Sequence, residues 1–302
     1  MAEQFEIRIA DGTVFKGWHW PAEEAKANLC VITGMDEYAF RYDRFAQWMN
    51  AHAVNVWVLD ALGQGLNAAS VEEQEIWPDD AFAKHIEAIH AMDVMAAANG
   101  LPTTQMGHSM GSFMTQAVIQ AYPAATDGVI LMGSNGGQAG LMKTASRLSK
   151  VLVNKKNRDL PNKTLTVMGL GAYAKAIKDA KTPVDWLSYN EENVKQYIDD
   201  PYCGNMNTGG FWQEFLKGMA TLWDDGSMAK VSKNENILLT SGMEDPVGQN
   251  SKGVRWLYNA YKKQGVKNVV LKLYPMMRHE ILNEDEWEKV CEDILAFLPK
   301  ND

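Results

Sequence analysis

The stretch Gln105-Met106-Gly107-His108-Ser109-Met110-Gly111-Ser112 has the form G-x-S-x-G. A short apolar run typical of a strand precedes it, and apolar residues at helical spacing follow from Phe113 to Ala121. In this motif the serine lies on a sharp strand-to-helix turn, where a Cβ at Gly107 or Gly111 would collide with neighbouring backbone. The sequence therefore predicts that Ser109 is a nucleophile above the carboxyl ends of a parallel sheet, at the positive end of a helix.

Strand patterns and helical patterns alternate on both sides of this motif. Apolar runs at 28–33 and 54–59 are typical of strands covered on both faces, and further strands are predicted at 128–132, 236–241 and 268–274. An antiparallel hairpin of 5–9 and 13–20 is predicted to open the chain. Helices are predicted at 42–52, 79–99 and 251–264 and around Trp287 to Leu298, where Asn283 with Glu286 predicts a capping box. The pattern indicates an α/β fold with a mainly parallel sheet flanked by helices, which binds ligands at the carboxyl ends of its strands.

The alternation stops between residues 136 and 228. This segment has polar breaks and no convincing buried strand, and it has helical patches at 141–153, 168–178, 193–198 and 211–222. A structureless loop of that length is implausible in a compact domain. We therefore predict a helical cap insertion at 136–228, within an α/β core formed by 1–135 and 229–302.

Charge and composition limit the partners. The chain has 302 residues, 29 Lys and Arg against 38 Asp and Glu, and a net charge of −9. This charge gives no electrostatic case for nucleic acid and a poor one for an anionic membrane surface, so the expected partner is a small molecule or a neutral lipid. The cysteines, Cys30, Cys203 and Cys291, lack C-x-x-C spacing and are predicted to be reduced core residues.

The first residues contain no basic region followed by an apolar stretch, and no run of 18 apolar residues occurs anywhere in the chain. We expect a soluble, cytoplasmic protein with no integral membrane segment. The oligomeric state is not indicated.

A serine nucleophile needs an imidazole base and a carboxylate that orients the base. In this kind of fold the chain order is Ser, then Asp or Glu, then His. Of the six histidines only His279 follows Ser109, and it comes where the last predicted strand ends. His279 is therefore the predicted base.

The preceding strand ends in Ser241-Gly-Met-Glu-Asp245-Pro246, which offers two carboxylates. We favour Asp245 over Glu244, because Pro246 fixes the chain just after it and a short side chain on a tight turn is better held. The strand after the nucleophile ends in Ser134-Asn135, which offers no carboxylate.

The oxyanion hole is predicted from two backbone N–H groups, those of Met110 and of Met35. Five methionines near the motifs would suit an adaptable acyl pocket, although they can equally be ordinary core residues: Met35, Met110, Met132, Met276 and Met277. No metal and no organic cofactor is implied.

With these residues assigned, the chain resembles the α/β-hydrolases, and within them the monoacylglycerol lipase and lysophospholipase group, also known as serine aminopeptidase-like hydrolases. The resemblance spans nearly the whole length. The segments that carry it are Gly34 with Arg41-Tyr-Asp-Arg-Phe-Ala, Asp60-Ala-Leu-Gly-Gln-Gly65, Gly107-His-Ser-Met-Gly111, Asn190 to Asp200-Pro201, Gly242-Met-Glu-Asp-Pro-Val247 and Arg278-His-Glu-Ile-Leu-Asn-Glu284.

The resemblance implies a cap of helices over an apolar acyl site, and hydrolysis of carboxylic esters of single acyl chains, such as lysophospholipid or monoacylglycerol. Two positions depart from the family pattern: Thr33 stands where a histidine is usual, and Gln64 stands where the loop usually reads G-H-G. The same fold and triad could serve an amide, a C–C bond or a peracid. A non-catalytic small-molecule binding protein is the alternative from another class.

Overall fold

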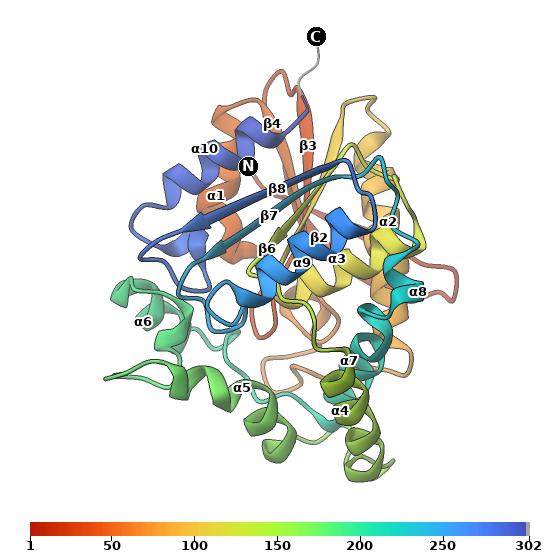
Figure 1. Ribbon diagram of the computed structural model, residues 1–302, viewed down its shortest axis with the longest axis vertical. Helices are drawn as coiled ribbons and strands as arrows, with labels where there is room; N and C mark the ends of the chain where they lie inside the picture. The colour runs from red at the N-terminus through yellow and green to blue at the C-terminus, as the bar shows by residue number, and fades with distance from the viewer. Residues whose placement is uncertain (300–302) are drawn as a thin grey trace.

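The computed structural model describes residues 1–299, and an eight-stranded sheet forms its centre (Figure 1). The lateral strand order is β1-β2-β4-β3-β5-β6-β7-β8. β1 pairs with β2 and β2 with β4 antiparallel, and every pairing from β4 to β8 is parallel. This confirms the predicted hairpin and mainly parallel sheet. The strands are β1 Glu3–Arg8, β2 Val14–Trp20, β3 Ala27–Ile32, β4 Val54–Leu59, β5 Thr103–His108, β6 Gly128–Met132, β7 Asn236–Gly242 and β8 Asn268–Tyr274.

Helices cover both faces of the sheet, as the apolar strands require. On one face α1 (Asp43–Ala51) and α10 (Trp287–Phe297) pack Phe45 and Ile294 into one apolar cluster. On the other face α2 (Ala81–Ala97), α3 (Met110–Ala121) and α9 (Lys252–Lys263) contribute Ile89, Met114 and Leu257 to a second cluster. The three central strands β3, β5 and β6 are buried along their whole length.

The segment between β6 and β7 is helical in the described residues, and it forms one end of the molecule (Figure 1). Its elements are α4 Ala139–Leu152, α5 Lys163–Ala176, η3 Asp185–Leu187, α6 Glu191–Asp199, α7 Gly209–Leu222 and α8 Asp225–Met228. The four predicted helical patches fall on α4 to α7. The division into a cap at 136–228 and a core at 1–135 and 229–302 stays a prediction, and residues 300–302 of that core lie outside the described residues.

One detail at the end of an element differs from the sequence-based expectations. The N-cap of α10 is Glu286, which makes no side-chain capping hydrogen bond, and the Asn283 side chain donates to Glu280 instead, so the predicted capping box is wrong. Short 3₁₀ helices also lie in the loops of the core: η1 (Ala39–Tyr42), η2 (Gly65–Asn67) and η4 (Ile281–Asn283).

The three cysteines are unpaired and buried, as predicted. Within residues 1–299, no helix has the length and apolarity that crossing a membrane requires.

Candidate active site

Ser109 lies on the turn between β5 and α3, with φ 52° and ψ −117°. This positive φ is strained for a residue with a Cβ, and the Ser109 N–H donates to the Met132 carbonyl at 3.0 Å, which ties the turn to β6. A Cβ at Gly107 would lie 2.3 Å from the Gly111 carbonyl oxygen, and one at Gly111 would lie 2.3 Å from that of Ile32. The predicted reason for both glycines is confirmed.

His279 and Asp245 are in direct contact. The Nδ1 atom of His279 lies 3.0 Å from Asp245 Oδ2, and both side chains are buried. Asp245 is held by Val247 N–H at 2.8 Å and by the Ser241 hydroxyl at 3.2 Å. A proton on Nδ1 that faces the carboxylate leaves Nε2 free to accept a proton.

Glu244, the other carboxylate at this strand end, points elsewhere. It accepts a hydrogen bond from the Tyr189 hydroxyl in the helical segment. Of the two acidic residues after β7, Asp245 is therefore the one that contacts His279.

Ser109 and His279 line the same cavity. The ring of His279 packs against Gly133, where a Cβ would lie 3.0 Å from its Cε1 atom. No hydrogen bond joins the Ser109 hydroxyl to His279 within the described chain. In the absence of substrate, catalytic hydrogen bonds are often long and tighten only when the substrate binds.

Met35 and Met110, the predicted oxyanion-hole residues, also line this cavity. Met110 is the first residue of α3, where the helix itself offers no acceptor for its N–H. The Met35 N–H has no hydrogen-bond acceptor among residues 1–299. Both N–H groups are thus free to bind an anionic oxygen.

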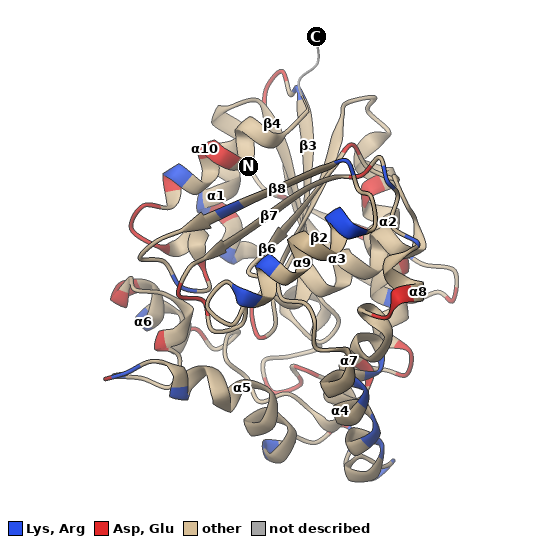
Figure 2. Cartoon of the chain, viewed as in Figure 1, with Lys and Arg blue, Asp and Glu red and all other residues tan. Residues whose placement is uncertain are grey.

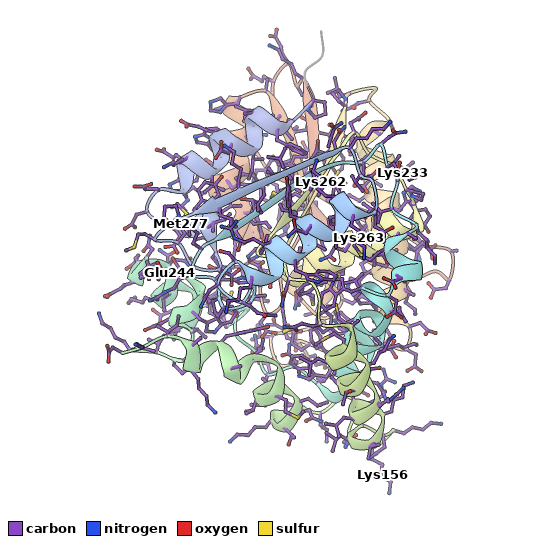
Figure 3. The ribbon with its side chains drawn as sticks, in the orientation of Figure 1. Lys156, Lys233, Glu244, Lys262, Lys263 and Met277 are labelled. Atoms are coloured by element: carbon purple, nitrogen blue, oxygen red, sulfur yellow. The ribbon has the colours of Figure 1, made fainter. Side chains whose placement is uncertain are left out.

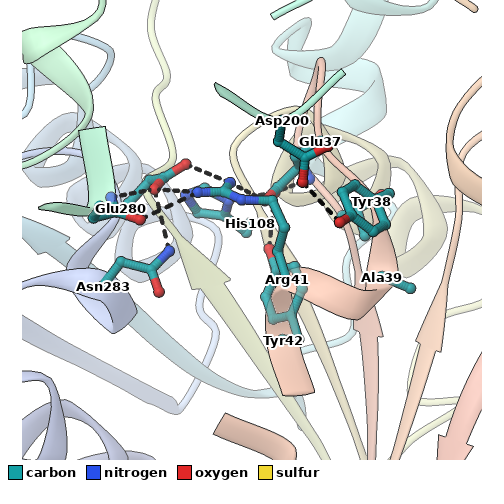
Figure 4. A network of polar contacts seen from close by, with 12 residues as sticks. Glu37, Tyr38, Ala39, Arg41, Tyr42, His108, Asp200, Glu280 and Asn283 are labelled. Carbon is teal, nitrogen blue, oxygen red and sulfur yellow. Dashed lines mark hydrogen bonds and ion pairs between the residues drawn. The ribbon is translucent and has the colours of Figure 1, made fainter. Parts of the chain in front are cut away.

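A buried polar network that the sequence did not predict lies beside these groups (Figure 4). Glu37 Oε1 accepts hydrogen bonds from Gly34 N–H at 2.5 Å, from His108 Nδ1 at 2.9 Å and from the Tyr42 hydroxyl at 2.9 Å. Because Gly34 precedes Met35 and His108 precedes Ser109, Glu37 joins the two loops that carry the predicted oxyanion groups and nucleophile.

Arg41 extends this network to the segment of the predicted base. Its guanidinium contacts Glu37 at 2.9 Å and grips both carboxylate oxygens of Glu280 at 2.7 and 2.8 Å. Asn193 of α6 donates to Glu280 at 2.7 Å. The only sequence signal for this network was the spacing of Glu37 and Arg41, four residues apart in a stretch otherwise typical of a strand-to-helix turn.

Burial and neighbouring charges act in opposite directions on the ionisable groups of this network. Burial favours the neutral form of Glu280, but the charge of Arg41 outweighs it and lowers the pKa of Glu280 to about 2. Burial likewise opposes the charged form of His108, yet the hydrogen bond and charge of Glu37 raise its pKa above the ordinary value. The pKa of Glu37 is lowered, because His108 and Arg41 together overcome its burial. The buried Arg41 guanidinium therefore faces two buried carboxylates, and the pKa shifts of Glu37 and His108 both favour a charged contact between these two side chains.

Neither departure from the family pattern reaches the cavity. The Thr33 hydroxyl is buried against the Leu59 carbonyl at 3.5 Å. The Gln64 amide donates to Glu75 at 3.1 Å beneath the helical segment.

The cavity has a volume of about 380 Å³ and lies between the strand ends and helices α4, α5 and α7. Its lining is largely apolar, with Phe113, Trp186 and Phe215 among the larger side chains. Of the five methionines considered from sequence, only Met35 and Met110 line it; Met132 and Met277 belong to the α1–α10 side of the core, and Met276 is exposed. Residues 1–299 contain no cluster of His, Cys, Asp or Glu arranged to hold a metal ion.

Comparison with known proteins adds a family to this geometry. The family model Hydrolase_4, described as "Serine aminopeptidase, S33", matches residues 23–286. A monoacylglycerol lipase from Mycolicibacterium smegmatis is 24% identical to this chain, and the match covers 92% of this chain and 90% of the lipase. Phospholipase YtpA from Bacillus subtilis is also 24% identical, and the match covers 93% of this chain and 98% of YtpA. A thermostable carboxyl esterase from Bacillus coagulans, solved with glycerol, superposes with a TM-score of 0.89 at 24% identity, covering 98% of this chain and 97% of that one.

Proposed function

Since this chain belongs to the serine aminopeptidase family of α/β-hydrolases, we propose that it is a carboxylic ester hydrolase that uses Ser109, His279 and Asp245. The observation that carries the proposal is the Asp245–His279 hydrogen bond of 3.0 Å, formed in the same cavity that Ser109 lines. A serine on a strained turn, an imidazole and a carboxylate are the parts that acyl transfer requires.

In this mechanism Ser109 Oγ bonds to the ester carbonyl carbon while His279 takes its proton. His279 then gives that proton to the leaving alcohol as the C–O bond breaks. A water attacks the acyl-enzyme with His279 again as base, which releases the acid and restores Ser109. Asp245 holds the imidazole and stabilises its cationic form, and the N–H groups of Met35 and Met110 bind the oxyanion in both steps.

The shape and lining of the cavity support one class of substrate. Its largely apolar lining suits one acyl chain, and its volume of about 380 Å³ leaves little room for a second. A relative named monoacylglycerol lipase supports an ester with a single chain, and a relative named phospholipase supports a lipid ester. We infer that monoacylglycerol or lysophospholipid is the substrate.

Active-site labelling tests the nucleophile. A fluorophosphonate should label the native protein and should not label the Ser109→Ala variant, because the probe reacts with an activated serine hydroxyl. Turnover of p-nitrophenyl butyrate should fall by several powers of ten in the same variant. An unlabelled native protein with no turnover would favour a binding protein on this scaffold, and near-native turnover by Ser109→Ala would end the assignment.

The two carboxylates after β7 form a matched pair of test positions. Asp245→Asn should lower kcat by about 10⁴-fold, because the amide stabilises the wrong imidazole tautomer. Glu244→Gln should leave kcat within about threefold, since Glu244 contacts Tyr189 and not His279. Equal losses from the two variants would remove Asp245 from the mechanism.

The substrate class is tested by comparing the hydrolysis of esters and of an amide-type substrate. Monoacylglycerol, lysophosphatidylcholine and an aminoacyl p-nitroanilide should be compared by kcat/KM at one pH. We expect an ester to exceed the anilide by at least about a hundredfold; a preference for the anilide would move the function to amide hydrolysis.

A further inference from the structure

Charge is unevenly distributed along this chain. Residues 136–182 contain ten Lys and Arg against two Asp, which leaves 19 Lys and Arg against 36 Asp and Glu in the rest of the chain. These residues include α4, α5 and the connection between them. In Figure 2 blue segments recur on α4 and α5, at the end of the molecule away from the chain termini.

Most of these cations have no carboxylate partner. Lys143, Arg158 and Lys181 form ion pairs, with Asp224, with Asp79 and Asp159, and with Glu191 respectively. The other seven are exposed, and none has a carboxylate within ion-pair distance in residues 1–299: Arg147, Lys150, Lys155, Lys156, Lys163, Lys175 and Lys178. Their positive charge is therefore available to a partner.

Large apolar side chains are exposed among the same residues. Val151 is 80% exposed, and four others are more than half exposed: Leu141, Leu160, Val167 and Met168. We call these five side chains and the seven unpaired cations the basic apolar face. Exposed apolar groups interspersed with Lys and Arg are typical of helices that lie in a lipid–water interface.

This face is continuous with the cavity. Val167 belongs to the face and also lines the cavity, and its neighbours Thr166, Leu170 and Gly171 on α5 line the cavity as well. On α4, Met142 lines the cavity, and the adjacent residue Leu141 is exposed and belongs to the face. A chain that leaves a lipid surface at this face would thus enter the cavity along α4 and α5.

We propose that the basic apolar face docks the protein on an anionic lipid–water interface. The net charge of −9, which disfavours such a surface for the chain as a whole, does not oppose this contact. At physiological salt, charges are screened over about 8 Å, so a docked surface experiences α4 and α5 rather than the acidic remainder. The proposal extends the proposed function, because it places the entry of a lipid substrate at the docked face.

A nucleic acid is the other polyanion that seven cations could bind. It would contact phosphates through Lys and Arg but would leave Val151, Leu160 and Met168 in water, and none of the aromatic stacking groups that single strands use lies on this face. The exposed apolar side chains therefore favour lipid.

The test measures binding in the Ser109→Ala background, so that its result does not depend on hydrolysis. The protein is sedimented with vesicles of pure phosphatidylcholine, or with vesicles containing about 30 mol % phosphatidylglycerol. We expect tighter binding to the anionic vesicles, weakened as salt rises. The variant Lys150→Gln/Lys155→Gln/Lys156→Gln should bind about a hundredfold more weakly, at about fivefold for each charge.

Three lysines far from this face provide the matched control. Lys233, Lys262 and Lys263 are exposed in or near α9, well above Lys156, which lies at the bottom of the view (Figure 3). Their triple Lys→Gln variant removes the same charge and should bind within about threefold of the parent. Equal weakening by both triples, equal binding to both vesicle types, or tighter binding to an oligonucleotide than to vesicles would overturn the proposal.

The apolar contribution is tested separately. Val151→Ser with Leu160→Ser should weaken the salt-resistant part of binding by about tenfold, since neither side chain carries charge. Unchanged salt-resistant binding would show that the apolar side chains take no part. The two proposals can fail separately. If the native protein hydrolysed no ester but the Ser109→Ala variant still bound anionic vesicles, the docking proposal would stand and the proposed function would be rejected.

Discussion

Asp36, the residue after Met35, is a buried carboxylate in an unusual setting. It has φ 59°, and the Asn207 amide donates both to its Oδ1 and, at 3.3 Å, to Glu75 Oε2. Neither Asp36 nor Glu75 forms an ion pair within residues 1–299. Burial, opposed by the hydrogen bond from Asn207 and reinforced by the nearby charge of Glu37, raises the pKa of Asp36 to about 7.

This raised pKa makes stability depend on pH. The folded state binds the proton of Asp36 more tightly than the unfolded chain, whose ordinary pKa is 3.8, so the free energy of unfolding falls as pH rises from about 4 to about 7. Asp36→Asn removes this loss, keeps an acceptor for Asn207 and tolerates positive φ. We expect the variant to be more stable than the native protein by about 2–4 kcal/mol at pH 8, in urea titrations, and to lose that advantage at pH 4.

Asp179 provides the control for this change. It also has a positive φ of 56° but is exposed, so Asp179→Asn should alter stability by no more than about 0.5 kcal/mol at either pH. An Asp36→Asn variant whose stability follows that of the native protein from pH 4 to pH 8 would contradict the assignment.

Single residues were predictable where the order of catalytic residues along the chain constrained them. Ser109, Asp245 and His279 come at the ends of three strands, and parallel strands bring their carboxyl ends to one edge of the sheet, so the Asp245–His279 contact could be expected from order alone. The bonds of Glu37 to His108 and of Arg41 to Glu280 follow no such rule. They join side chains 71 and 239 residues apart, and their pairing depends on how loops fold over the strand ends.

At the scale of elements, Arg41 holds several segments together. It lies in η1 and contacts Glu37 in the loop after β3, Glu280 just before η4 and Asn193 in α6. Its side chain and those of both glutamates are almost fully buried. A buried ion pair is expensive to break from one side, because the remaining charge is left without a partner.

Replacing this arginine should therefore destabilise the fold. Arg41→Met is expected to lower the free energy of unfolding by about 3–5 kcal/mol, measured by urea denaturation at pH 7, because two buried carboxylates lose their shared cation. The free energy of unfolding of Arg41→Lys should lie between those of Arg41→Met and the native protein. An ammonium keeps the positive charge but cannot form hydrogen bonds to both carboxylate oxygens of Glu280 in the way that the guanidinium does.

The comparison residue is Arg147 on α4, which is exposed and has no ion pair within the described chain. Arg147→Met should change stability by about 0.5 kcal/mol or less. If the Arg41→Met and Arg147→Met proteins unfolded at the same urea concentration, the network would not stabilise the fold.

Long elements were predictable because periodicity has room to show itself. β4 matches its apolar run at both ends, and α7 ends where its helical pattern ends. α8 and η3 are four and three residues long, too short for any helical period, and both were missed. The capping box failed for a different reason: Asn283 is drawn into the Glu280 network, a tertiary contact that local spacing does not contain.

At the scale of the whole molecule, the cavity forms only where two layers meet. Its walls come from the strand ends and from α4, α5 and α7, so no single stretch of sequence indicates it. The methionine assignment shows why: Met132 precedes the loop at the site, but its side chain points to the α1–α10 face of the sheet. Successive strand residues alternate between faces, so proximity in sequence does not decide which side a residue lines.

The layered cavity makes chain-length preference a property of the helical segment. Each methylene buried there contributes about 0.8 kcal/mol, so kcat/KM for p-nitrophenyl esters should rise about fourfold per methylene until the cavity is full. Ala174 on α5 lines the cavity, and Ala172, two residues away on the same helix, is exposed and does not. Ala174→Trp should occupy space that an acyl chain needs.

We therefore expect Ala174→Trp to lower kcat/KM for p-nitrophenyl decanoate by at least about tenfold. The kcat/KM for p-nitrophenyl acetate should stay within about threefold of the native value, because a two-carbon acyl group remains near Ser109. Ala172→Trp, which adds the same ring outside the cavity, should leave kcat/KM unchanged for esters of every chain length. A parallel loss on acetate and decanoate in Ala174→Trp would mean that the substitution disturbs the catalytic groups rather than the chain site. An unchanged series would mean that the acyl chain does not lie between the strand ends and α5.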